Sequence, residues 1–400
     1  MKRNHLLMSV IATALTFATA SFARASDEAG TKSEIKLGQT QPYSGPVSAA
    51  SAVGYAMSGY VEYINRRGGI NGRKVVLISL DDAYSPPKTV EMTRKLVEGD
   101  EVIATVGSLG TPTNAAVQKY LNARKVPQLF VVSGGKRFFD PKGSPWTIPL
   151  LPSYEAEGRA MGRYAASAVT DPKIAIIYQN DDLGRDFVAG FKEGLGAKKS
   201  AIISEQSFEL SAPTIQTQMV TAKASGANVL YFAGTQKYGA MHIRIRYELD
   251  WKPVHLIAST SAGVESVIKP AGFQQSEGVI STAYSKDPFD ERWKDDPETK
   301  AYLAWFKEYL PSRNLDDTSH LVGYYAGYLT EYILKKAGSD LSGENLLRIA
   351  SNLDKVRVPM LLPGVTVSTA PANYNVIDKF QMQRFASGHW VPFGELVGSD

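Results

Sequence analysis

Cysteine is absent from the 400-residue sequence. Its absence excludes disulfides, zinc-thiolate sites and cysteine nucleophiles. It also excludes the lipid-modified cysteine that tethers many exported proteins to a membrane. Histidine is scarce, since the five histidines are scattered and no pair has the spacing of metal ligands. We therefore expect neither a metal nor a cofactor.

Strong charge and long hydrophobic runs are missing as well. The 44 basic and 40 acidic residues give a formal net charge of only +4, and the basic residues are dispersed. Nothing here indicates a nucleic-acid partner. No segment after residue 25 has 18 apolar residues without charges, so we expect no stable membrane insertion of the mature chain.

The first 25 residues have the pattern of a secretory signal peptide. Lys2 and Arg3 form a basic start, residues 6–20 are apolar or small, and the sequence Ala-Arg-Ala at 23–25 is a small-x-small cleavage site. A membrane anchor is the alternative, but the apolar run is short and rich in Ala and Thr. We predict cleavage between Ala25 and Ser26 and a freely diffusing periplasmic protein.

The remaining 375 of the 400 residues suffice for two domains of about 150 residues each. Apolar strands and amphipathic helices alternate along this part, a pattern typical of βαβ units around a parallel sheet. The expected strands are 35–40, 74–80, 102–106, 127–132, 173–178, 229–232 and 253–258. The expected helices are 51–66, 88–97, 111–123, 155–168, 185–195, 214–224 and 238–249.

Two stretches match each other and indicate an internal repeat. Residues 102–107 and 229–234 are apolar strands that end in glycine, and each leads through a helix to a proline and a second apolar strand. Those second strands end at Ser133 and Ser259. We interpret the match as two similar α/β domains in tandem.

The last part of the chain has too few alternating units for a third domain. Helices are expected at 297–309, 318–336 and 344–353, followed by a hairpin with its turn at 387–388. We expect this part to complete both earlier domains, which requires the chain to cross between them several times.

Six loops at the expected carboxyl ends of strands carry small polar residues and glycine. Ligands of open parallel sheets bind at this edge, where loops and helix N-termini present backbone N–H groups. Each loop alone is explained as well by helix capping, but six loops facing one cleft favour a site for a ligand carboxylate. The candidate contacts are Tyr43, Ser44, Thr111, Ser133, Gly134, Gly135, Lys136, Asp182, Leu183, Thr235, Ser259 and Thr260.

Enzyme motifs are missing from the same loops. No G-x-S-x-G nucleophile elbow occurs. Residues 134–137 lack the rest of a phosphate-binding loop, and residues 107–110 lack the third glycine of a dinucleotide fingerprint. The pairs at 81–82 and 181–182 are adjacent carboxylates that point apart in an extended chain, so we expect caps and hinge contacts there. We predict a binding protein and not an enzyme.

Several local motifs together resemble one known family. They include Ser-Gly-Pro at 44–46, Gly-Gly-Ile-Asn-Gly-Arg at 68–73 followed by Asp-Asp-Ala at 81–83, Gly-Thr-Pro-Thr at 110–113 and Tyr-Gln-Asn-Asp-Asp-Leu-Gly at 178–184. From residue 35 to about 395 the sequence resembles the type I periplasmic binding proteins of branched-chain amino acid transporters, the leucine/isoleucine/valine-binding family.

The resemblance implies an α/β fold of two Rossmann-like lobes joined by a three-crossover hinge, with the ligand in the cleft between them. The lobes are expected at residues 34–150 plus 284–358 and 151–283 plus 359–398. The implied partners are a small carboxylate-bearing ligand and the membrane permease of an ABC transporter, and we expect a monomer. A periplasmic sensor that presents its ligand to a receptor is an alternative with the same lobes.

The resemblance also assigns roles to single residues. The ligand carboxylate is implied at Thr111 and at 133–136, with Lys136 or Arg137 as reinforcement. The acidic residue that holds the α-ammonium of an amino acid in this family matches Thr260 here. Because a buried unpaired ammonium is costly, we expect an aromatic or aliphatic acid.

Three further matches bear on the size of the ligand. Family tyrosines that line the cleft match Ala50, Leu183 and Thr235, which leaves room for a bulkier body. A branched-chain amino acid is the alternative ligand, if Glu265 takes the place of the missing acidic residue.

Overall fold

The structure is a computed structural model that describes residues 34–398, so the predicted signal peptide at 1–25 lies outside the described residues. Its first sheet is entirely parallel, with the strand order β2-β1-β3-β4-β5. The strands are β1 (Ile35–Gln41), β2 (Val75–Asp81), β3 (Ala104–Val106), β4 (Gln128–Val131) and β5 (Thr147–Pro149).

The second sheet repeats this arrangement and adds a hairpin. Its order is β12-β11-β10-β9-β8-β6-β7, in which β6 to β10 are parallel and β11 and β12 antiparallel. Its strands are β6 (Ile174–Gln179), β7 (Ile202–Phe208), β8 (Val229–Ala233), β9 (Val254–Ile257), β10 (Ile280–Ala283), β11 (Lys379–Ala386) and β12 (His389–Gly398). The orders β2-β1-β3-β4-β5 and β7-β6-β8-β9-β10 are equivalent, which supports the interpretation of two tandem α/β domains.

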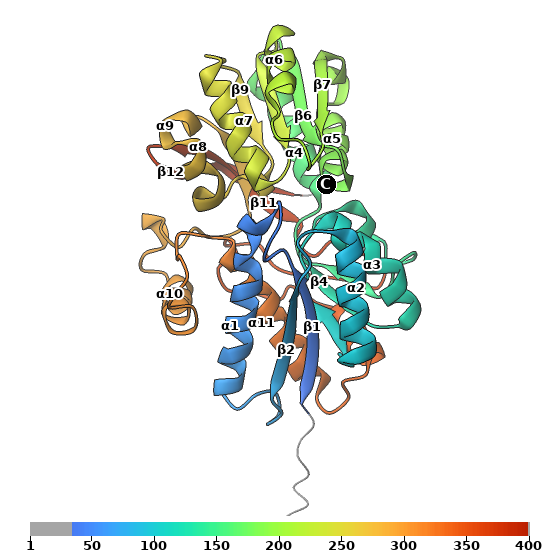
Figure 1. Cartoon of the computed structure of the whole chain (residues 1–400). Coiled ribbons are helices and arrows are strands. Elements are labelled where there is room, and N and C mark those ends of the chain that lie inside the picture. The colour runs from blue at the N-terminus through green and yellow to red at the C-terminus, as the bar shows by residue number, and fades with distance from the viewer. Residues whose placement is uncertain (1–33, 399–400) are drawn as a thin grey trace, which may run out of the picture. The chain divides into compact units, whose positions relative to one another are not determined.

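Helices cover both faces of each sheet, which confirms the predicted α/β class. In Figure 1, α1 and α11 lie together on one side of the first sheet, and α2 and α3 pack together on the other side. In the second sheet α4 packs on α5 and α6 on α7. The helices are α1 (Ala52–Arg66), α2 (Pro86–Arg94), α3 (Thr111–Arg124), α4 (Tyr154–Ala168), α5 (Asp182–Gly194), α6 (Gln216–Ala224), α7 (Gln236–Glu248), α8 (Lys269–Ala271), α9 (Phe273–Ser276), α10 (Pro297–Tyr309), α11 (His320–Ala337) and α12 (Gly343–Ala350).

Local sequence explains how α4 and α5 come to lie so close together. Ser153 and Asp181 cap the two helices by accepting bonds from the N–H groups of Ala156 and Gly184. A Cβ atom at Gly190 would lie 1.9 Å from the carbonyl oxygen of Glu155. Only glycine permits this approach, so the pair forms a rigid base for the residues that follow β6.

The chain crosses between the two sheets three times, as the family resemblance implied. It passes from β5 to α4, returns after β10 to α10, and passes again to β11 after residue 377. Residues 360–377 contribute Met360, Val365 and Ile377 to the hydrophobic cluster that contains β1. The predicted lobe boundaries stay a prediction, and this packing favours counting residues 360–377 with the first lobe.

The C-terminal hairpin was predicted from its turn residues. Ser387 and Gly388 adopt φ values of 53° and 85°, as the tight turn between β11 and β12 requires. The edge strand β7 was not predicted, because its sequence IISEQSF carries polar residues at most positions. No helix among residues 34–398 is both long enough and apolar enough to cross a membrane.

Candidate ligand-binding cavity

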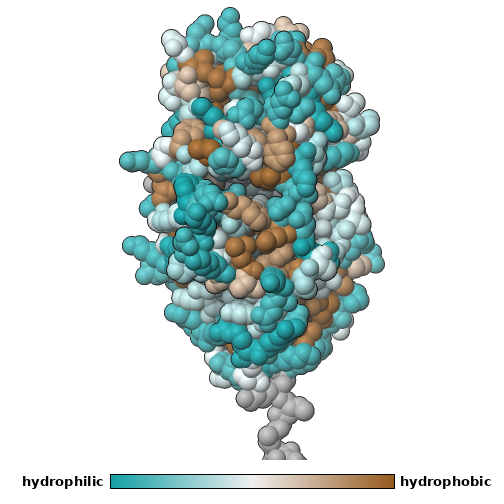
Figure 2. Space-filling view, turned by 90° about the vertical axis from the view of Figure 1, so that its left-hand side faces the viewer, coloured by the Kyte–Doolittle hydropathy of each residue, from teal (hydrophilic) through white to brown (hydrophobic). Residues whose placement is uncertain are grey.

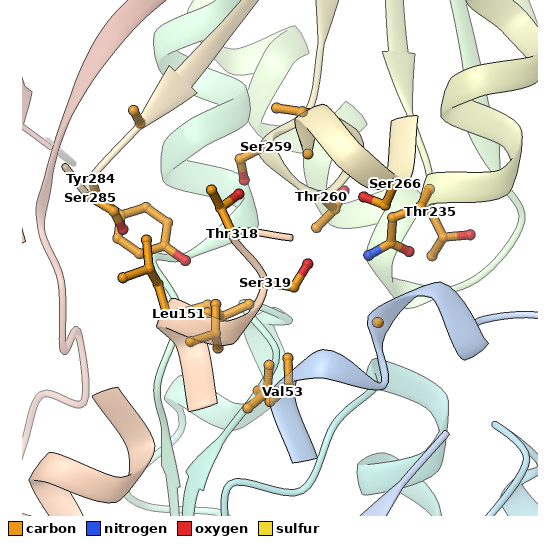
Figure 3. Close-up of a pocket in the computed structure, with 18 of the residues that line it drawn as sticks. Val53, Leu151, Thr235, Ser259, Thr260, Ser266, Tyr284, Ser285, Thr318 and Ser319 are labelled. Carbon is orange, nitrogen blue, oxygen red and sulfur yellow. The ribbon is translucent and has the colours of Figure 1, made fainter. Parts of the chain in front are cut away.

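A cavity of about 240 Å³ lies where loops of the first sheet meet loops of the second. Figure 2 shows a hollow on this side of the molecule with apolar side chains near it. In Figure 3, Thr235, Ser259 and Thr260 come from the second lobe and face Val53 and Leu151 across the cavity. The walls thus come from strand-end loops of both lobes, as expected for the predicted cleft.

Five of the twelve candidate contacts line this cavity. They are Thr111, Leu183, Thr235, Ser259 and Thr260. Ala50, which matches a family tyrosine together with Leu183 and Thr235, lines it as well.

Tyr43 and Ser44 lie elsewhere in the first lobe. The Tyr43 hydroxyl lies 2.6 Å from the hydroxyl of Ser79, and Ser44 bonds to Asp81 through both its N–H and its hydroxyl. Their predicted role as ligand contacts has no support in this geometry, because both polar groups are already bonded within the protein.

Residues 133–136 and Asp182 also lie outside the wall of the cavity. Ser133 is fully buried behind Thr111, and a Cβ atom at Gly134 would lie 2.1 Å from the carbonyl oxygen of Pro152. Gly135 donates its N–H to the hydroxyl of Ser133. None of them is positioned to touch a ligand directly in this arrangement.

Lys136 and Arg137 connect the two lobes instead of facing a ligand. The Lys136 N–H donates to Asp186 at 2.7 Å, and its ammonium lies 2.9 Å from Glu155. The Arg137 guanidinium lies 3.2 Å from Asp182. Burial raises the pKa of the Asp186 carboxyl to about 6. The expected reinforcement of a ligand carboxylate by these cations is therefore not what the geometry provides.

A cluster of hydroxyl groups stands at the start of α3 on the first-lobe side. The hydroxyls of Thr111 and Ser133 are 2.8 Å apart, and Tyr154 contributes a third. Burial raises the pKa of Tyr154, while hydrogen bonds with the Gly134 backbone, Ser133 and Thr111 lower it. Gly110 gives the helix no side-chain cap, and Pro112 in its first turn has no N–H. The hydroxyl of Thr111, which lines the cavity and can accept a proton from Ser133, is therefore the group placed to donate to an anion.

Hydroxyl groups also line the second-lobe side, but with different partners. The carboxylate of Glu157 accepts the N–H of Ser259 at 2.7 Å and its hydroxyl at 2.6 Å. The Thr260 hydroxyl donates to the carbonyl oxygen of Gly234 at 2.8 Å. Burial raises the pKa of Glu157, and the bonds from Ser259 and Thr282 oppose that shift.

Apolar side chains fill the space between these two polar sides. They belong to the segment before α1 and to α1 itself, to the loops after β3 and β4, to the crossover after β5, and to the start of α5. They include Val47, Val53, Leu109, Val132, Leu151 and Leu183. A ligand body held here would be hydrocarbon in character.

Two charged residues line the cavity within residues 34–398. The Lys286 ammonium is buried and lies 2.9 Å from Asp296 and 2.8 Å from Glu298. Asp287 accepts the N–H of Phe289, and burial raises its pKa. Among the same residues no group of three or more His, Asp or Glu is arranged to hold a metal ion.

Several lining residues were missed by sequence reasoning. Tyr284, Lys286 and Asp287 lie on the crossover after β10, and Tyr154 is the first residue of α4 after the crossover from β5. Thr318 and Ser319 precede α11. No strand-end motif marks these positions. The implied three-crossover hinge was the one signal that could have indicated them, since crossovers pass beside the cleft.

Glu265 does not line the cavity. It lies on the short helix 264–268 and pairs with Lys269 at 3.0 Å. This partner satisfies the carboxylate, which weakens Glu265 as a substitute for the acidic residue expected at the position of Thr260.

Comparisons with known proteins agree with this fold. Leu/Ile/Val-binding protein homolog 3 of Brucella melitensis is 27% identical over 239 residues, which span 60% of this chain and 62% of that protein. A branched chain amino acid ABC transporter protein from Thermus thermophilus with bound valine has a TM-score of 0.80 at 17% identity, over 92% of this chain and 97% of that one. A solute-binding protein of an ABC transporter from R. palustris, in complex with benzoate, has a TM-score of 0.77 at 19% identity, over 92% and 98%.

The two solved structures show the shared fold alone, because their identities are low. The sequence of residues 34–387 matches the family described as periplasmic binding protein. This match spans nearly all of the described residues, including the three crossovers and every strand of both sheets except β12. The chain belongs to the periplasmic binding protein family.

Proposed function

We propose that this protein is the periplasmic substrate-binding component of an ABC uptake transporter and that it binds a small aromatic or aliphatic carboxylic acid. The observation that carries the proposal is the hydroxyl cluster of Thr111, Ser133 and Tyr154 at the uncapped start of α3. The hydroxyls of Thr111 and Tyr154 lie at the wall of an apolar cavity, and Ser133 is hydrogen-bonded to Thr111 from behind. Such hydroxyls at a helix N-terminus suit a carboxylate attached to a hydrocarbon body.

The second-lobe wall supports an acid without an ammonium group. The family's acidic residue is replaced by Thr260, and the nearby carboxylate of Glu157 is already occupied by Ser259 and Thr282. An ammonium placed against this wall would be buried without a charged partner. The benzoate complex of the protein from R. palustris is a precedent for an acid of this kind on the same fold.

Hinge closure is the mechanism that fits a cavity with walls from two lobes. The ligand stabilises the closed arrangement because it contacts both lobes at once. A membrane permease then distinguishes loaded from empty protein by the distance between the lobe surfaces. The function needs binding and motion, and no catalytic step.

A branched-chain amino acid is the second candidate ligand, and Asp287 favours it. This carboxylate lines the cavity and could accept an ammonium at a place that the family pattern does not mark. The valine complex of the protein from Thermus thermophilus is the corresponding precedent.

A thermal-shift panel separates the two candidates. Benzoate, cyclohexanecarboxylate and medium-length aliphatic acids are compared with leucine, isoleucine and valine, each at equal concentration. A ligand present at 100 times its Kd adds about 2.7 kcal/mol to the free energy of unfolding. We expect the acids to raise the melting temperature more than the amino acids.

The primary amide of each acid is the matched control. Benzamide keeps the ring of benzoate and lacks its charge, so it is expected to give no shift. Equal shifts from amide and acid would contradict the carboxylate site. A larger shift from leucine than from every acid would establish the amino-acid candidate.

A further inference from the structure

The hydroxyl group of Thr260 has already given its only proton to the protein. It donates to the carbonyl oxygen of Gly234 at 2.8 Å, and a carbonyl oxygen can only accept. Thr260 lines the cavity (Figure 3). What it can still offer a ligand is therefore a pair of electrons, so that it accepts a hydrogen bond and does not donate one.

The hydroxyl of Thr235 also donates its proton within the protein. Its hydroxyl donates to the Oε1 atom of Gln179 at 2.9 Å. The amide of Gln179 is held in this orientation because its Nε2 group donates to the carboxylate of Asp181 at 2.5 Å. The amide therefore presents an acceptor to Thr235, and Thr235 has no proton left for a ligand.

Two further hydroxyls of this lobe are directed at Glu157. Ser259 donates to its Oε2 atom at 2.6 Å, and Thr282 also donates to this carboxylate. The Ser259 N–H donates to the Oε1 atom of Glu157. Both side chains line the cavity and have used their protons in the same way as Thr235 and Thr260.

These four residues, Thr235, Ser259, Thr260 and Thr282, form what we call the acceptor patch. It contrasts with the hydroxyl cluster at α3, where Thr111, Ser133 and Tyr154 hydrogen-bond to one another and none of the three donates to a carboxylate or a carbonyl oxygen. When Ser133 donates to Thr111, the proton of Thr111 remains for an anion. We propose that the acceptor patch selects a ligand with a neutral hydrogen-bond donor, so that the solute is a hydroxy-substituted carboxylic acid. This inference rests on the proposed function, since it assumes that the carboxylate lies at the α3 end.

A hydroxyl group fits the acceptor patch better than an ammonium does. The patch presents neutral oxygens, and the carboxylate behind it has its oxygens occupied by Ser259 and Thr282. A neutral hydroxyl needs one acceptor and loses little when it leaves water, whereas a buried ammonium needs a charge in direct contact. A second carboxylate is excluded as well, because it would face lone pairs alone.

The test compares hydroxybenzoates with their methyl ethers by calorimetry. The isomers with the hydroxyl at ring positions 2, 3 and 4 are each paired with the methoxybenzoate of the same position, since a methoxy group accepts but cannot donate. We expect at least one isomer to bind about tenfold more tightly than its ether, or about 1.4 kcal/mol. The same comparison is then made with the Thr260→Val variant.

Thr260→Val is a mild change for the fold. The carbonyl oxygen of Gly234 keeps the hydroxyl of Ser261 as a donor at 2.8 Å, so the protein loses no obligatory bond. In this variant we expect the advantage of hydroxyl over methoxy to fall to about twofold. Because the ratio is taken within each protein, the extra bulk of the methyl group cancels between the two.

Ser225→Ala is the matched control on the same lobe. Ser225 lies outside the wall of the cavity, where its hydroxyl donates to the carbonyl oxygen of Ala222, and its removal is expected to leave the advantage intact. If benzoate and its derivatives bind but hydroxyl and methoxy forms are equal in the wild-type protein, the inference is overturned and the proposed function stands. If no carboxylate of the panel binds, the proposed function fails. An equal advantage in Thr260→Val and wild type would show that the donor lies elsewhere.

Discussion

The loops that follow β4 and β9 occupy equivalent places in the two sheets and differ in what they touch. After β4, Ser133 is buried, Gly134 packs against Tyr154, and Lys136 reaches Glu155 and Asp186 on the second lobe. After β9, Ser259 and Thr260 face the cavity. The first loop connects the lobes, and the second contributes to the candidate site.

This difference shows what the strand-end rule can and cannot predict. The rule gives the edge of the sheet at which a ligand binds, and both loops lie near the cavity, which Val132 lines before one loop and Ser259 and Thr260 line in the other. It does not give the direction of each side chain. On the first lobe the donors come from the helix that follows β3, at Thr111, and the loop after β4 supports them from behind.

The largest effect is expected from filling the space of Gly134. In Gly134→Ala the new methyl group would meet the carbonyl oxygen of Pro152 at 2.1 Å, a backbone atom that cannot turn away. We expect a loss of about 2–3 kcal/mol in the free energy of unfolding, measured by urea denaturation without ligand.

Gly263→Ala is the matched control in the loop after β9. Its methyl group would meet only the hydroxyl of Ser266, at 2.4 Å, and that side chain can rotate. We expect a much smaller loss. Equal losses in the two variants would contradict the conclusion that the loop after β4 is the tightly packed one.

The next effect concerns ligand affinity and separates Thr111 from Lys136. Thr111→Val removes a donor from a charged acceptor in a desolvated site, so we expect binding of the best acid to weaken by about 10- to 100-fold. Lys136→Met should change the Kd by less than about threefold, because its ammonium is bonded to Glu155 and its side chain is 68% exposed.

Isothermal titration calorimetry measures both variants. The melting temperature without ligand checks that Thr111→Val still folds as the wild type does. Losses of affinity of similar size in the two variants would show that Lys136 contacts the ligand, as the sequence analysis predicted.

The smallest effect is a pH dependence of the free energy of unfolding, and it arises at Asp186 in the contact between the lobes. Burial raises the pKa of Asp186 from its ordinary 3.8 to about 6 in the folded protein, and its neighbours Glu155 and Asp182 add to the shift while Lys136 opposes it. The protonated form is therefore favoured by folding. The resulting contribution to the free energy of unfolding is fully present below the ordinary pKa of 3.8 and is lost as pH rises through 6.

Asp186→Asn isolates this contribution, because asparagine can still accept the N–H of Lys136 and does not titrate. We expect the variant to gain stability relative to the wild type as pH rises from 4 to 7, by less than about 1 kcal/mol at this partly exposed position. Parallel stability curves over this pH range would contradict the raised pKa of Asp186.

Much of the fold was predictable because its signals are local. Residues 297–309 match α10, and the turn at 387–388 joins β11 and β12. The five candidate contacts that line the cavity follow strands in the same local way. By contrast, Tyr284 and Lys286 reach the cavity through a crossover whose path depends on the packing of both lobes, and no local pattern reports that path.

Which hydroxyl groups donate and which accept also could not be predicted from the sequence. Thr111 and Thr260 are the same residue type at comparable loop positions. The hydroxyl of Thr111 is bonded to that of Ser133, where either group can donate, whereas the hydroxyl of Thr260 donates to the carbonyl oxygen of Gly234. Only the three-dimensional partners distinguish a donor end of the cavity from an acceptor end.

The most direct test of this polarity is a crystal structure of the protein with the acid that binds most tightly in the thermal-shift panel. We predict that the ligand carboxylate lies about 3 Å from the hydroxyl of Thr111, with the ligand body against Leu183 and the far end toward Thr260. A carboxylate bound against Ser259 and Thr260, with the ligand body at the start of α3, would contradict the assignment of the two ends.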